Sequence, residues 1–235
     1  MPSGTQVRYE LQTNGTLLSD AWLDLFERYE VAVGVSLDGP PRANDRHRLS
    51  HAGRSSAASA VRGIELLRSR PQLFAGLLAV VDLANDPAEV HDYLAAFAPP
   101  VIDFGLPHAT HDDPPHRGDP SVPEYGLWMS KVYDTWLAQP EHRHSVRMLE
   151  DIVALSSGVR GSVETLGLAP PTSVVIESDG SIEGGGGYLP HRFSAADGYR
   201  NPSVYCADLE YLIRHVQGSL RQHGWDPYAQ ATSSS

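Results

Sequence analysis

Cysteine is almost absent from this sequence of 235 residues, which contains Cys206 and no other. A single thiol forms no internal disulfide, and it supplies too few ligands for a zinc knuckle or for an iron–sulfur cluster of its own. Disulfide-stapled scaffolds and cysteine-rich metal modules are therefore excluded as descriptions of this sequence.

Positive charge and long apolar runs are also scarce. The 29 acidic and 18 basic side chains give a formal net charge of −11, which argues against nonspecific binding to nucleic acid. No apolar run reaches the roughly 18 residues that a membrane span needs. The first six residues show neither the basic nor the apolar part of a secretory signal. We therefore expect a cytoplasmic protein with no nucleic-acid and no membrane partner.

Strand and helix patterns alternate over the first 140 residues. Apolar alternation and short apolar runs predict strands at 7–12, 31–37, 74–81 and 101–106. Helical periodicity predicts one helix that begins at Ser19, one at 56–69, one that begins after Asp86 and one at 124–138. Four βα units in series imply an α/β fold with a parallel sheet, whose functional loops follow the carboxyl ends of the strands.

The first strand and helix carry specific burial expectations. Strand 7–12 should be half-buried, because its apolar side chains fall on every second position. The helix that begins at Ser19 should bury one face. That face comprises Ala21, Trp22, Leu25, Phe26 and Tyr29.

The pattern changes after residue 140. It predicts a helix at 145–157, a hairpin at 174–182 and a helix at 207–222. Residues 230–235 are small and polar, which predicts a disordered tail. The expected domains are 1–140 for the parallel sheet and 141–229 for the helix, hairpin and C-terminal region.

Polar residues follow two predicted strands in a recognisable order. The first strand ends in Gln12-Thr13-Asn14-Gly15-Thr16-Leu17-Leu18, and the second in Val35-Ser36-Leu37-Asp38-Gly39-Pro40-Pro41. With Asp45-Arg46-His47-Arg48 and Gly53-Arg54-Ser55-Ser56, these motifs resemble radical S-adenosylmethionine (SAM) enzymes of the sulfatase-maturase type. The plainer reading is that Asn14-Gly15 is a common turn and that Ser36 satisfies a backbone group.

Later motifs resemble one subgroup of that family, the actinobacterial enzymes that form cyclophane crosslinks in ribosomal peptides. They are Pro107-His108-Ala109-Thr110, Pro114-Pro115 and the stretch from Val174 to Ser181. The stretches from Gly185 to Arg192 and from Asn201 to Leu209 are similar to the end of its SPASM domain. The resemblance covers most of the chain.

The resemblance implies a partial (β/α)6 barrel, comprising strands 3–6 of the family, followed by a truncated SPASM-like region. It implies SAM and a [4Fe–4S] cluster as cofactors, and a precursor peptide that is crosslinked through a 5′-deoxyadenosyl radical. Ser36 and Asp38 suit the ribose or methionine part of SAM, and Arg48 or Arg54 suits its carboxylate. The expected SAM-binding residues are Gln12, Asn14, Ser36, Asp38, Arg48 and Arg54.

The sequence departs from the family in two places. The Cys-x-x-x-Cys-x-x-Cys loop and the Gly-Gly-Glu motif of the earlier barrel strands are not found in it. SPASM cysteines expected between Glu183 and Gly184 are also missing, and Cys206 matches a remnant ligand of an auxiliary cluster. We therefore expect the isolated chain to bind no cluster, and we assign no catalytic residue.

Three interpretations stay open: an inactive gene fragment, half of a split enzyme completed by a second chain that carries the cluster, and a non-catalytic peptide-binding subunit. A remote alternative is a metal-dependent hydrolase with ligands at His108, His111 and His116. That segment is rich in proline and polar residues, which is also typical of a solvated loop.

Overall fold

The computed structural model describes residues 7–109, 112–139, 144–157, 174–176, 182–184 and 204–223. The chain divides into two compact units. The first comprises Met1–Gly105 with Thr135–Val146, and the second comprises Leu106–Asp134 with Arg147–Ser235. The division expected at residue 140 stays a prediction, and the expected disordered tail at 230–235 lies outside the described residues.

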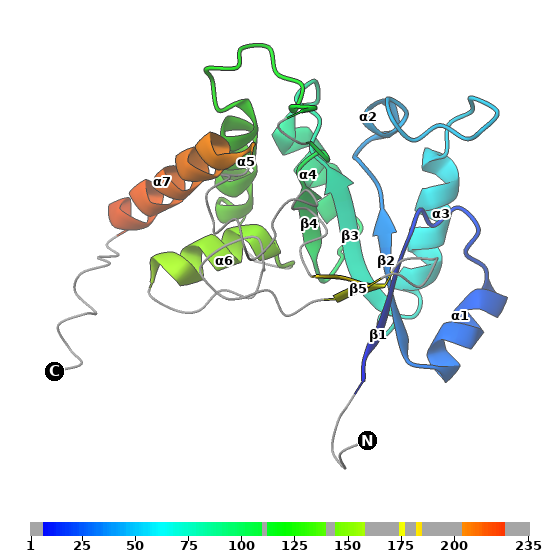
Figure 1. Cartoon of the computed structure of the whole chain (residues 1–235). Helices are drawn as coiled ribbons and strands as arrows, with labels where there is room; N and C mark the ends of the chain where they lie inside the picture. The colour runs from blue at the N-terminus through cyan, green and yellow to red at the C-terminus, as the bar shows by residue number, and fades with distance from the viewer. Residues whose placement is uncertain are drawn as a thin grey trace, which may run out of the picture. The chain divides into compact units, whose positions relative to one another are not determined.

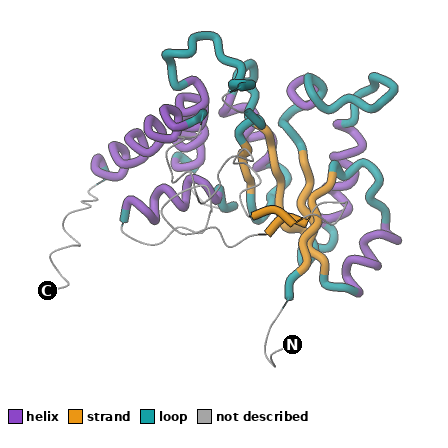
Figure 2. Tube along the Cα trace, in the orientation of Figure 1, coloured by secondary structure: helices purple, strands orange, loops and turns teal. Residues whose placement is uncertain are grey.

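A four-stranded parallel sheet forms the centre of the first unit (Figures 1 and 2). Its strands are β1 (Tyr9–Thr13), β2 (Val31–Ser36), β3 (Phe74–Val80) and β4 (Ile102–Gly105), in the order β1-β2-β3-β4. The α/β fold with a parallel sheet that the sequence predicts is therefore confirmed, and each strand begins and ends within two residues of its predicted bounds.

The register of the sheet brings the polar strand ends to one edge. Gln12 of β1 pairs with Gly34 of β2, and Ser36 pairs with Leu78 of β3. Because all four strands run in the same direction, the loops that follow Thr13, Ser36 and Val80 leave the sheet at a common edge.

Helices follow the strands as the sequence predicts. They are α1 (Asp20–Arg28), α3 (Ala57–Arg68) and α4 (Pro87–Ala95), with a short additional helix α2 (Pro41–Asn44) that no periodicity announces. The start of α4 conforms to the sequence signal, since the Asp86 carboxylate accepts a hydrogen bond from the Glu89 amide at 2.9 Å.

The predicted half-burial of β1 is wrong, and on the predicted inward face of α1 Phe26 is buried as expected, whereas Trp22, Leu25 and Tyr29 are exposed. Tyr9 is 58% exposed, and on α1 Trp22 and Tyr29 are 47% and 57% exposed, whereas Leu23 and Phe26 are buried. Apolar residues surround more than half of this helix, so periodicity alone does not identify the inward side. The helix packs against β2, and only the Leu23 and Phe26 side of the apolar stripe is covered.

A short segment after α5 extends the sheet beside β4. The Ser145 amide donates to the Pro100 carbonyl at 2.9 Å, and the Ile102 amide donates to the Ser145 carbonyl at 2.8 Å. Next to it, the buried His144 ring lies 3.1 Å from that of His91 on α4, measured between their Nε2 atoms. Sequence periodicity does not reveal this imidazole pair.

The second unit contains most of α5 (Glu124–Leu137), α6 (Arg147–Ser156), the hairpin strands β5 (Val174–Ile176) and β6 (Ile182–Gly184), and α7 (Cys206–Gln222). The helices and the antiparallel hairpin match the sequence prediction. No helix in the described ranges is long and apolar enough to cross a membrane.

Asp208 of α7 joins α7 to the start of α5. Its carboxylate accepts hydrogen bonds from the Tyr125 and Gly126 amides at 2.9 and 3.1 Å, which satisfies donors at a helix N-terminus. It also pairs with Arg117, whose guanidinium lies 5.1 Å from the centre of the Tyr125 ring. The hydrogen bond that Arg117 donates to Asp208 raises the pKa of Arg117.

Replacement of Asp208 by alanine should therefore destabilise the second unit strongly. The Asp208 side chain is 2% exposed and that of Arg117 is 11% exposed, so the substitution leaves a buried cation and two helix amides without their partner. We expect a loss of about 3–5 kcal/mol in the free energy of unfolding, measured by urea denaturation. Glu210→Ala, which removes an exposed ion pair with Arg214 on the same helix, is the control and should cost less than about 1 kcal/mol. Equal losses for both variants would contradict this account.

Candidate functional site

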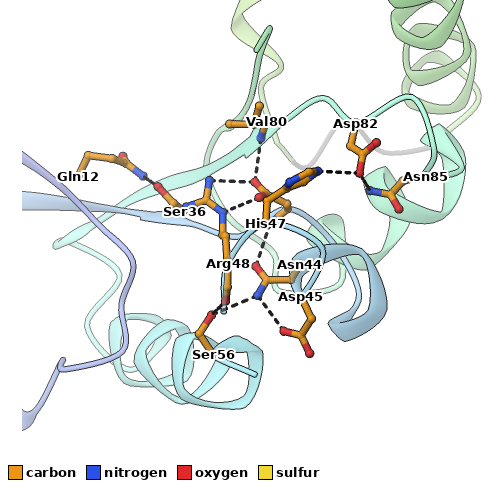
Figure 3. Close-up of polar contacts among 11 residues, drawn as sticks. Gln12, Ser36, Asn44, Asp45, His47, Arg48, Ser56, Val80, Asp82 and Asn85 are labelled. Carbon is orange, nitrogen blue, oxygen red and sulfur yellow. Dashed lines mark hydrogen bonds and ion pairs between the residues drawn. The ribbon is translucent and has the colours of Figure 1, made fainter. Parts of the chain in front are cut away.

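Gln12 and Ser36 meet across the first two strands. The Gln12 Nε2 atom donates a hydrogen bond to the Ser36 hydroxyl oxygen at 3.0 Å (Figure 3). Because that oxygen accepts the amide proton, the Ser36 hydroxyl retains its own proton for a further acceptor. Both residues were predicted from the sequence, and the register of the sheet brings them together.

Asp38, just beyond β2, is held by an arginine and by the next strand. Its side chain is 4% exposed. The Arg48 Nε and Nη2 atoms donate to its two oxygens at 2.5 and 2.9 Å, and the Val80 amide donates to Oδ1 at 2.9 Å. The carboxylate therefore joins β2, β3 and the loop that carries Arg48.

Asn44 and Ser56 also hold the segment between Asp38 and Arg48 in place through hydrogen bonds. The buried Asn44 side chain donates to the Ser56 hydroxyl at 3.3 Å, and its oxygen accepts from the Asp38 amide at 3.4 Å. Ser56 in turn donates to the Arg48 carbonyl. These contacts fix the backbone on both sides of the Asp38–Arg48 pair.

Asp82, at the end of β3, is a member of the site that the sequence reading missed. It accepts hydrogen bonds from Arg46 Nε at 2.6 Å, His47 Nε2 at 3.2 Å and the Ala84 amide at 2.9 Å. Partial burial alone would raise the pKa of Asp82, but these hydrogen bonds outweigh it and lower the pKa below its ordinary value. The signal was available, because Asp82 follows a buried strand as Asp38 does.

The other two expected SAM-binding residues, Asn14 and Arg54, form hydrogen bonds elsewhere. The Asn14 side-chain oxygen accepts from the Thr16 amide at 3.1 Å and from the Thr16 hydroxyl at 2.9 Å, which closes a turn around Gly15. Arg54 is exposed, and its amide donates to the Ser50 hydroxyl at 3.1 Å. Among the described residues, no hydrogen bond joins either side chain to the Ser36, Asp38 and Arg48 group.

The remaining metal-ligand candidates lie apart from this group in sequence. Cys206 is the first residue of α7 and is exposed. His108 and His116 are exposed, and His111 falls outside the described residues. Within the described ranges, no three histidine, cysteine, aspartate or glutamate side chains are placed to hold a metal ion.

Curated proteins with related sequences point to one kind of enzyme. A serine-type anaerobic sulfatase-maturating enzyme of Klebsiella aerogenes is 38% identical over 105 residues, which cover 44% of this chain. A second such enzyme, from Bacteroides thetaiotaomicron, is 24% identical and aligns with 92% of this chain. This chain is homologous to the anaerobic sulfatase-maturating enzymes. No protein-family model matches it.

Solved structures agree on the fold. A structure described as native anSMEcpe with bound AdoMet and Cp18Cys peptide has a TM-score of 0.66, covers 92% of this chain and is 21% identical. The chain spans only part of these sulfatase-maturase relatives: 26% of the Klebsiella aerogenes enzyme, 54% of the Bacteroides thetaiotaomicron enzyme and 60% of that solved chain.

The chemistry available at the strand ends is recognition rather than proton transfer. Arg48 supplies a fixed cation whose Nη1 group makes no hydrogen bond within the described residues, and Ser36 supplies a hydroxyl donor. Asp38 is used internally, because its oxygens already accept three hydrogen bonds. The arrangement suits a ligand with a carboxylate and neighbouring oxygen acceptors.

Asp82→Asn should lower stability at neutral pH and lose its effect in acid. Since the pKa of Asp82 is lowered on folding, its contribution is present above the ordinary value of 3.8 and disappears as the pH falls through the folded-state pKa. We expect the wild type to be more stable by about 1–2 kcal/mol at pH 7, and the difference to shrink as the pH falls below the ordinary value of 3.8. Chemical denaturation across this pH range measures it. Glu65→Gln, which affects an exposed pair with Arg68, is the control; a pH-independent difference for Asp82→Asn would contradict the account.

Proposed function

We propose that this chain is the SAM-binding part of a radical SAM-type maturase, which crosslinks side chains of a ribosomally synthesised peptide. The observation that carries the proposal is the Asp38–Arg48 pair beside Ser36 at the carboxyl edge of a parallel sheet. Homology to sulfatase-maturating enzymes supports it, as do structural neighbours described with bound AdoMet.

The residues present fit the amino-acid end of SAM. Arg48 uses Nε and Nη2 to bind Asp38, and Nη1 has no hydrogen-bond partner in the part of the chain that the structure describes, so it can donate to a carboxylate. The Ser36 hydroxyl can donate to a second oxygen of the ligand. SAM, when bound beside a reduced iron–sulfur cluster, supplies the radical chemistry, and this chain's residues hold and orient it.

The residues of this chain do not fit the cluster itself. A [4Fe–4S] cluster needs several thiolates, and Cys206 is the only cysteine in the sequence. We therefore propose that cysteines outside this sequence supply it, either from a longer polypeptide of which this is a part or from a second chain. An inactive fragment is the outcome if neither exists.

The outer side of β1 supports such a complement. Tyr9 and Leu11 on β1 are 58% and 38% exposed, although parallel sheets are ordinarily covered on both faces. A further strand and helix packed against this side would bury those side chains and place additional loops at the same edge as Ser36 and Arg48.

Two lines support a peptide substrate. Structural neighbours are described in complex with the Cp18Cys and Kp18Cys peptides. The segments Pro107-His108-Ala109-Thr110 and Pro114-Pro115 resemble the cyclophane-forming subgroup, which is the reason to propose a side-chain crosslink as the product.

SAM binding tests the proposal. Because the cluster would supply most of the affinity, we expect a Kd on the order of 1 mM, about 4 kcal/mol, measured by ligand-observed NMR or calorimetry. Ser36→Ala and Arg48→Lys should each weaken binding about fivefold or more, since each removes one good hydrogen bond. Arg62→Lys on α3 is the control, because Arg62 contacts only its own helix in the described residues. Binding that both site variants leave unchanged would move the site elsewhere.

A further inference from the structure

The side chain of Gln12 packs directly against Gly34. The two residues are register partners on β2 and β1. A Cβ atom built on Gly34 would lie 2.2 Å from the Gln12 Oε1 atom and 3.1 Å from its Cδ atom. The first separation is far below an ordinary van der Waals contact and the second is a few tenths of an ångström below it, so the Gln12 amide occupies the space that any side chain at position 34 would fill.

Backbone conformation does not explain this glycine. Gly15, Gly39, Gly53 and Gly76 adopt positive φ, and Gly34 does not. Glycine in the interior of a strand is unfavourable and often marks a place where another group approaches closely. The group that approaches Gly34 is the Gln12 amide, and that amide reaches Ser36 from there.

The position of the amide determines what Ser36 offers a ligand. Gln12 Nε2 donates to Ser36 Oγ and uses one of its two lone pairs, so the hydroxyl proton points away from Gln12. Ser36 is thereby oriented to donate to a ligand acceptor, such as a carboxylate oxygen. If the amide moved, the hydroxyl would rotate freely and this polarity would be lost.

We propose that Gly34 is a positioning residue of the SAM site, which acts through Gln12 to fix Ser36 as a hydrogen-bond donor to the ligand. This inference rests on the proposed function and names a residue that the motif comparison did not include. Because Gly34 has no side chain, it leaves room for the Gln12 amide. It acts on the ligand only through the Gln12–Ser36 pair.

The obstruction at Gly34 is the movable end of a side chain, and this makes the inference testable. At Gly63 on α3, by contrast, an added Cβ would lie 2.3 Å from the Gly15 carbonyl oxygen, so a substitution there would displace backbone. Gly34→Ala requires only that the Gln12 amide swing aside. The variant should therefore fold, with the Gln12–Ser36 hydrogen bond broken.

The test is a double-mutant cycle on SAM affinity with Gly34→Ala, Gln12→Ala and the double variant. Thermal melting confirms that each is folded. Gly34→Ala should weaken SAM binding about fivefold, the effect of one lost hydrogen bond, and Gln12→Ala should do the same. The double variant should bind no more weakly than Gln12→Ala alone, because the amide that Gly34 accommodates is then gone. Gly218→Ala on α7, where an added Cβ meets nothing within 4 Å, is the control and should leave binding unchanged.

The outcomes separate this inference from the proposed function. If Gly34→Ala weakens binding equally with and without Gln12, a general distortion of the strand is at work and the positioning role is overturned. If the wild type binds SAM and Gly34→Ala binds equally well, the positioning role alone is overturned. If the wild-type chain binds no SAM, the proposed function fails and this inference fails with it.

Discussion

The ion pair between the buried Asp38 carboxylate and the partly exposed Arg48 guanidinium is the interaction on which the site depends. The carboxylate, 4% exposed, accepts two hydrogen bonds from Arg48 and one from the Val80 amide, so β2, β3 and the segment from Pro41 to Arg48 share a single anchor. Loss of Arg48 would leave the buried Asp38 charge without its ionic partner, which costs up to about 3–5 kcal/mol. This ion pair therefore fixes the orientation of the Arg48 side chain. Any recognition of a ligand carboxylate by Arg48 depends on that orientation.

Two further ion pairs between aspartate and arginine join distant segments of the described chain. Asp82 receives Arg46 at the end of β3, and Asp208 receives Arg117 at the start of α5. Each joins residues that lie more than 30 positions apart. The planar guanidinium can bind two carboxylate oxygens at once, which a lysine cannot match. A chain whose basic residues are nearly all arginine is suited to ion pairs of this kind.

Strands β2 and β3 were predictable because they are short apolar runs, a pattern typical of strands buried on both faces of a parallel sheet. The inward side of α1 was not, since Trp22, Leu23 and Phe26 surround the helix and packing against β2 decides which are covered. Ser36 and Asp38 were predictable as polar residues at a strand end. The choice between Arg48 and Arg54 was not, because it depends on how the loop folds back to Asp38. The role of Gly34 depends on a side chain from the neighbouring strand, so the hydrophobic periodicity of the sequence could not predict it.

Amide hydrogen exchange on Asp38→Asn tests the central claim most directly. Asparagine has the shape of aspartate but no charge, so the strand end is preserved while Arg48 loses its ionic partner. The Asp45 and Arg48 amides, which donate to the Pro41 and Asn44 carbonyls in the wild type, should exchange at least about tenfold faster. The Val90 amide of α4, which donates to the Asp86 carbonyl, should keep its wild-type rate. Wild-type exchange at both Asp45 and Arg48 in the folded variant would contradict the claim that Asp38 holds this loop in place.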